Sequence, residues 1–179
     1  MKDGLFKTIL YTILGIGIMT AIMTLTSMTT PFEGVYIQFA YGYLALFAGV
    51  AGAIPAAIVG FTGHVLFDLI YTDHLWLSWA LSTGALGFVF GFAIRRKSLR
   101  QGVFSEHDMI RFNVVQAVVN IAIFGLIAPT LDVLFYQHST TIVFTQGWIA
   151  SIINLLTVAI FGTITLKLYA KYKLKQNKQ

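Results

Sequence analysis

The strongest constraint on the fold is an apolar stretch that is too long to be a single membrane helix. It runs from Val35 to Tyr71 and carries one charged residue, Asp68. A single helix over it would be about 55 Å long, whereas the hydrocarbon core of a bilayer is about 30 Å thick. The chain must therefore turn within the stretch. Gly49–Pro55 is the predicted turn, because glycine frees the backbone and proline can begin a new helix.

Four further apolar runs complete the pattern: Leu5–Ser27, Leu77–Ile94, Ile110–Leu134 and Phe144–Leu168. Hydrophobic residues make up 57% of the chain and charged residues 11%, against about 25% charged in a typical soluble domain. These features exclude an ordinary cytosolic enzyme. They predict an all-α, polytopic membrane bundle that forms one domain over residues 1–179. Its six transmembrane helices are expected at about 5–27, 36–52, 54–70, 77–94, 110–134 and 144–168.

The charges support this count of six helices and orient the bundle. With the amino end inside, the inner side holds all twelve Lys and Arg, and the outer loops 29–34, 72–75 and 136–142 hold none. This distribution obeys the positive-inside rule, whereas five helices would place Arg95–Arg100 outside. Both termini are therefore expected in the cytoplasm of a cell-membrane protein. The net charge of +5 indicates topology and contact of the tail after Lys167 with anionic lipid, not a nucleic-acid partner.

Polar side chains inside the membrane are the candidates for function. An Asp at the centre of a bilayer costs about 2.5–3.5 kcal/mol on insertion scales, so such residues need a reason to be there. The candidates gather in the outer half of the bundle, which predicts a cavity open to the outside. The predicted substrate-binding residues are Gln38, Tyr41, His64, Asp68, Trp79, Asn120, Asp132, Gln146 and Asn154.

His64 and Asp68 are spaced i, i+4 and so share one helix face. Three interpretations stay open. The pair contacts a ligand, the two side chains bond each other, or they relay protons. The relay has one weakness, because no chain of carboxylates continues toward the cytoplasmic side.

Three other candidates also allow two interpretations. Asn120 belongs to a stripe with Asn113 and Gln116, which either bonds neighbouring helices or reaches the floor of the cavity, where Asn154 is a plausible partner. Asp132 either binds a donor group of the ligand or faces water at the interface. Trp79 belongs either to an aromatic belt or to a surface that stacks on a flat heterocycle.

Several kinds of chemistry are missing from the sequence. It has no Cys, so thiolate metal sites and disulfides are excluded. It has no Gly-x4-Gly-Lys-Ser/Thr phosphate loop and no Gly-x-Ser-x-Gly nucleophile elbow. The four His are scattered, which argues against a metal cage. No catalytic residue, metal or cofactor is therefore expected.

Three long segments resemble a known family. They are GFTGHVLFDLI (60–70), GVFSEHDMIRFNVVQAVVN (102–120) and IAPTLDVLFYQHSTTIVFTQG (127–147). They resemble the S component of energy-coupling factor (ECF) vitamin transporters, most closely the branch assigned to hydroxymethylpyrimidine. Members of that branch are also labelled riboflavin-type or pyridoxine-type.

The resemblance implies a role and partners. An S component captures a vitamin from outside and joins a transmembrane T subunit and two ATPases. Small residues on its first helix, spaced small-x-x-x-small, meet the T subunit, and Gly17 and Ala21 fit that spacing here. The expected function is capture of hydroxymethylpyrimidine, or of a pyridoxine- or riboflavin-like heterocycle, for ATP-driven uptake. The alternative is a stand-alone proton-coupled carrier of a small heterocycle.

Overall fold

The structure is a computed structural model that describes residues 2–72 and 74–179. Part of the predicted outer loop 72–75 therefore lies outside the described residues. Apolar helices form almost all of the fold, and a short antiparallel hairpin joins the first two. In order, the elements are α1 (Lys2–Thr26), β1 (Met28–Thr29), β2 (Tyr36–Ile37), α2 (Ala40–Ala51), α3 (Ala53–Phe67), η1 (Asp68–Thr72), α4 (Leu77–Ala93), α5 (Arg96–Arg100), α6 (Glu106–Asn120), η2 (Ile121–Ile127), α7 (Ala128–Tyr136), α8 (Thr140–Thr157), η3 (Val158–Gly162) and α9 (Thr163–Gln176).

Three of the long helices contain a π-helical segment. These segments are η1, η2 and η3, and they continue α3, link α6 to α7 and link α8 to α9. A π-helical turn carries an extra residue, so the face a helix presents changes across it. The segment η1 begins at Asp68, and η2 begins directly after Asn120.

The prediction of an all-α membrane bundle is confirmed. Within the described residues, four helical stretches are long and apolar enough to cross a bilayer: Gly4–Thr26, Ala53–Thr72, Glu106–Tyr136 and Thr140–Gln176. The other two apolar helices, α2 and α4, are shorter. At 1.5 Å per residue they reach only about 18 Å and about 26 Å, so the count of six spans stays a prediction.

The long apolar run reverses direction at Gly52, between α2 and α3. Gly52 has a φ of 101°, a left-handed conformation that glycine adopts easily. The Arg96 and Arg100 guanidinium groups both donate to the carbonyl oxygen of Val50, at 3.1 and 3.0 Å. Positive groups at the end of α2 are stabilising because the carboxyl end of a helix carries partial negative charge.

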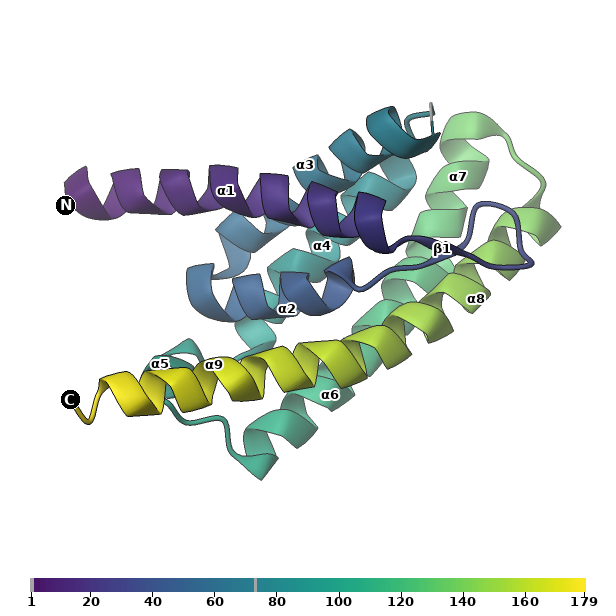
Figure 1. The fold of residues 1–179 in the computed structure, drawn as a ribbon. Coiled ribbons are helices and arrows are strands. Elements are labelled where there is room, and N and C mark those ends of the chain that lie inside the picture. Colours follow the sequence, from purple (N-terminus) through teal and green to yellow (C-terminus); the bar gives the residue numbers. More distant parts are fainter. Residues whose placement is uncertain (1, 73) are drawn as a thin grey trace.

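The bundle has two distinct ends. Both chain termini and α5 lie at one end, whereas the hairpin, α7 and the start of α8 lie at the other (Figure 1). The basic residues of α5 and α9 are therefore at the end that carries the termini. This is the arrangement that the positive-inside rule requires.

Small residues let α3 and α4 pack closely. A Cβ added to Gly87 would lie 2.5 Å from the Ala56 carbonyl oxygen, and one added to Gly60 would lie 2.6 Å from the Thr83 carbonyl oxygen. Gly91 approaches Ala53 in the same way. Such close approach is the usual way in which membrane helices associate. It fixes α4, with Trp79 and Thr83, against the part of α3 that carries His64.

This packing predicts that Gly87→Ala destabilises the protein although alanine favours helices. A methyl group pressed against the Ala56 backbone should lower the free energy of unfolding by about 1–3 kcal/mol. Gly17→Ala is the matched control, because a Cβ there meets nothing within 4 Å. Thermal unfolding of both variants in detergent measures the difference. Equal midpoints for the two variants would contradict the packing.

Candidate functional site

A cavity opens at the end of the bundle away from the termini. Its volume is about 380 Å³, and it is bounded by the hairpin, α2, α3 with η1, α4 and α8. Seven of the nine predicted binding residues line it: Gln38, Tyr41, His64, Asp68, Trp79, Gln146 and Asn154. The structure brings these side chains together from four helical stretches, α2, α3 with η1, α4 and α8, and from the segment that follows the hairpin.

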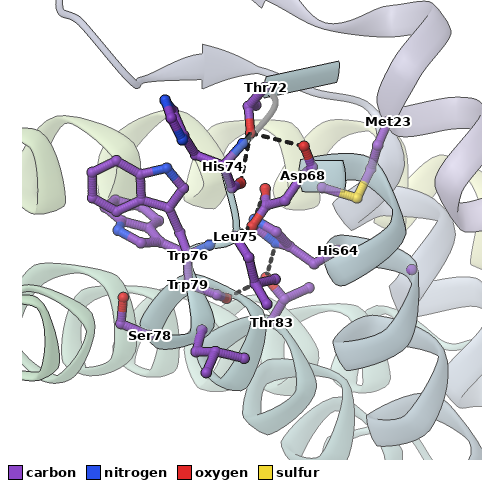
Figure 2. A network of polar contacts seen from close by, with 12 residues as sticks. Met23, His64, Asp68, Thr72, His74, Leu75, Trp76, Ser78, Trp79 and Thr83 are labelled. Atoms are coloured by element: carbon purple, nitrogen blue, oxygen red, sulfur yellow. Dashed lines mark hydrogen bonds and ion pairs between the residues drawn. The ribbon is translucent and has the colours of Figure 1, made fainter. Parts of the chain in front are cut away.

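His64 and Asp68 lie in the wall of the cavity within a polar network (Figure 2). His64 Nδ1 is 2.7 Å from Thr83 Oγ1, and the Thr83 hydroxyl is 3.0 Å from the Trp79 carbonyl oxygen. Asp68 Oδ2 accepts the backbone N–H of Trp76 at 3.0 Å. His64 Nε2 and Asp68 Oδ1 are 3.5 Å apart, which is longer than a strong N–H···O hydrogen bond. The two side chains therefore do not satisfy each other fully.

Asp132 lies behind the wall of the cavity. It is completely buried and does not line the cavity, so the expectation that it faces water is wrong. Its Oδ2 accepts the indole N–H of Trp79 at 2.8 Å, and its Oδ1 accepts the Ser78 hydroxyl. Asp132 on α7 thus orients Trp79 on α4, and the predicted direct contact with a ligand is replaced by this positioning role.

Asn120 also lies away from the cavity, so the expectation that it reaches the cavity floor is wrong. It is fully buried, and its amide nitrogen donates to the backbone and side-chain oxygens of Gln116, at 2.8 and 3.0 Å. The rest of the stripe bonds neighbouring helices. Asn113 donates to Thr163 at 2.9 Å, and Gln116 donates to the Leu155 carbonyl oxygen at 3.3 Å. Asn113 and Gln116 therefore follow the interhelical interpretation, whereas Asn120 bonds within its own helix.

Gln146 joins the hairpin to α8. Its amide nitrogen donates to the Glu33 carbonyl oxygen at 2.8 Å. A second contact holds the base of the hairpin, where the amide of Gln38 donates to the Ser27 hydroxyl at 2.9 Å. The hairpin loop therefore forms one side of the mouth of the cavity.

Several aromatic and polar residues of the cavity were not predicted. Phe67 and Thr72 share a helical stretch with His64 and Asp68, and the i, i+3 spacing of Phe67 from His64 was a signal that could have found it. His74 and His138 lie in loops, for which periodicity gives no signal. The unpredicted residues that line the cavity include Tyr36, Phe67, Thr72, His74 and His138.

An aromatic cluster stands at the mouth of the cavity. The ring of His138 is 5.1 Å from that of Trp76 and 5.6 Å from that of Tyr136. Deeper in the wall, the rings of Trp79 and Phe124 are 5.8 Å apart. Flat aromatic faces beside directional polar groups can hold a small heterocycle. No cluster of three or more metal-ligating side chains occurs among residues 2–72 and 74–179.

Gly17 and Ala21 do not line the cavity. Both are exposed on α1, and a Cβ on Gly17 would meet no atom of the described chain within 4 Å. The opposite face of α1, with Met19 and Met23, is buried against the bundle. The small-residue stripe is thus available at the lipid-facing surface.

These features define the class of the protein. It is a bundle of apolar helices with a polar and aromatic cavity at one end, suited to holding a small molecule within the membrane. Many large apolar side chains on its outer surface are exposed, among them Leu25, Phe92 and Leu134. In a chain of such helices they face lipid.

Comparison with known proteins identifies the family. Residues 6–171 match the family model of the ECF-type riboflavin transporter S component. Relatives include a UPF0397 protein of Lactococcus lactis subsp. cremoris (strain NZ9000), 39% identical and covering 98% of this chain and 96% of its own. Another, from Enterococcus faecalis (strain ATCC 700802 / V583), is 38% identical and covers 92% of each chain. No solved structure matches.

The chain therefore belongs to the ECF S-component family. It is a multi-pass cell-membrane protein and a substrate-binding transporter subunit of the vitamin type, and the family is not one of enzymes. The names of the relatives state no substrate. The assignment to hydroxymethylpyrimidine accordingly stays a proposal.

The position of Asp132 predicts the effect of a single substitution. Asp132→Asn leaves one acceptor oxygen for two donors, so it should lower the free energy of unfolding by about 1–3 kcal/mol and loosen Trp79. Thermal unfolding and near-ultraviolet circular dichroism measure the two effects. Glu106→Gln, at an exposed carboxylate of the same helical stretch, is the control and should change the free energy by less than about 0.5 kcal/mol. An Asp132 variant as stable as this control would contradict the positioning role.

Proposed function

We propose that this protein captures a small vitamin or vitamin precursor from outside the cell as the S component of an ECF transporter. Hydroxymethylpyrimidine, or a pyridoxine- or riboflavin-like heterocycle, is the proposed substrate. The main support for this proposal is that five predicted side chains converge on one cavity at the end of the bundle away from the termini. They are Gln38, Tyr41, His64, Trp79 and Asn154.

The composition of the cavity wall supports this class of substrate. Tyr41, Phe67 and Trp79 provide flat apolar surface, while Gln38 and Asn154 carry amide groups. Ligand sites of this kind combine apolar area for affinity with a few placed polar groups for orientation. Asn120 and Asp132 do not line this wall, so they are not proposed to contact the substrate. The proposed binding residues are therefore Gln38, Tyr41, His64, Asp68, Trp79, Gln146 and Asn154.

The proposed partners are a transmembrane T subunit and two ATPase subunits. Support comes from family membership and from the exposed stripe at Gly17 and Ala21. Two small residues one helical turn apart leave a shallow groove into which another helix can fit closely. The chain has no phosphate loop of its own, so ATP hydrolysis is assigned to the partners.

Substitutions in the stripe test the proposal. Gly17→Leu and Ala21→Leu should abolish co-purification of the T subunit and ATPases and stop uptake. Calorimetric binding of the substrate to the isolated subunit should stay within about twofold, because the stripe is exposed on α1 and does not line the cavity. Ala85→Leu, which enlarges an exposed small residue on α4, is the control and should leave the complex intact.

Two results would contradict the proposal. One is a complex that survives both substitutions. The other is uptake that continues without ATPase partners and collapses when the proton gradient is dissipated. The second result would favour the stand-alone proton-coupled carrier that uses His64 and Asp68.

A further inference from the structure

The cavity has an unusual charge distribution. Its ionisable wall residues include Glu33, Asp68, His64 and His138, and among the described residues no Lys or Arg side chain lines it. The basic residues of α5, α9 and the start of α6 lie toward the other end of the bundle (Figure 1). A carboxylate or phosphate group on a ligand would find no cationic side chain in this wall.

Asp68 is the group that most needs a partner. It is 2% exposed, and a buried carboxylate is costly unless it is paired and hydrogen-bonded. Oδ2 accepts the Trp76 backbone N–H. The polar neighbour of Oδ1 is His64 Nε2, 3.5 Å away. One oxygen of a buried carboxylate is thus left without a close donor among the described residues.

The direction of the bond between His64 and the Thr83 hydroxyl decides the tautomer of His64. When the Thr83 hydroxyl donates its one proton to the Trp79 carbonyl oxygen, Oγ1 has no proton left for the histidine. Thr83 Oγ1 is then the acceptor for His64 Nδ1–H, at 2.7 Å. In the neutral ring this leaves Nε2 without a proton, since only one of the two nitrogens carries one. In this tautomer Nε2 and Asp68 Oδ1 face each other as two acceptors.

Two acceptors that converge on one point of a cavity call for a donor (Figure 2). We infer that the ligand supplies it, as a cationic N–H group that binds between Asp68 Oδ1 and His64 Nε2. The substrate class is then an amine-bearing or protonated heterocycle, and carboxylated or phosphorylated relatives of the same ring are excluded. This inference rests on the proposed function and adds the charge of the substrate to it.

A matched set of ligands tests the charge preference. Pyridoxamine, pyridoxine and 4-pyridoxate share one ring and carry an aminomethyl, a hydroxymethyl and a carboxylate group at the same position. The corresponding 2-methyl-4-aminopyrimidines with aminomethyl, hydroxymethyl and carboxylate groups at position 5 form a second set. Calorimetric titration of the wild-type protein should give, on at least one ring, a cation that binds about tenfold more tightly than the neutral compound. The anion of that ring should bind at least about tenfold more weakly than the neutral compound.

Two variants assign the preference to Asp68. Asp68→Asn should remove the difference in affinity between the cation and the neutral compound. Glu33→Gln is the matched control, because Glu33 also lines the cavity but is exposed to water. It should keep the full preference. If Asp68→Asn fails to fold, the order of the affinities of the wild-type protein for cation, neutral compound and anion decides whether the inference holds.

Three outcomes would overturn the inference. They are an anion that binds as tightly as the neutral compound, a cation preference that survives in folded Asp68→Asn, and no binding of any of the six compounds. Co-purification of the wild-type protein with a T subunit and ATPases is measured in a separate experiment, so that the proposed function is tested independently of the charge preference. If those partners are retained, the proposed function stands and only the charge assignment fails.

Discussion

The fold depends on one constraint, that polar groups buried in a membrane must find partners within the protein. Lipid offers no hydrogen bonds, so an unpaired buried group costs several kcal/mol. Asp132 meets the constraint through Ser78 and Trp79, and Asn120 meets much of it through Gln116. His64 and Asp68 meet it only in part. At the site, the bonding capacity that these two side chains do not use within the protein faces the cavity.

Close helix packing converts this constraint into a defined geometry. The glycines of α3 and α4 bring the two backbones together, and Thr83 therefore lies within 2.7 Å of His64. Asp132 on α7 then fixes Trp79 one turn before Thr83. The geometry of the cavity wall thus depends both on the glycines and on the buried carboxylate of Asp132. Small residues allow α3 and α4 to associate closely, and the large side chain of Trp79 on α4 then forms part of the binding wall.

Sequence reasoning recovers what depends on composition and on position along a helix. Charge clusters and apolar runs predict the membrane bundle, and the reversal at Gly52 lies inside the stretch where glycines and Pro55 indicate a turn. The i, i+4 spacing of His64 and Asp68 places them on one face. The rotation of a helix about its own axis is not predicted by composition or by depth in the membrane. Depth alone suggested that Asn120 and Asp132 reach the cavity, but η2 separates them and changes the face presented. His138, in a loop, gave no periodic signal.

The most direct test of capture in this cavity is to identify the small molecule that the protein holds when it is purified gently from native membranes. Native mass spectrometry should find one small heterocycle per chain, free of carboxylate and phosphate, and Trp79→Ala should release it while the protein stays folded. A lipid in its place, or a heterocycle retained by the folded Trp79 variant as firmly as by the wild type, would contradict capture in this cavity.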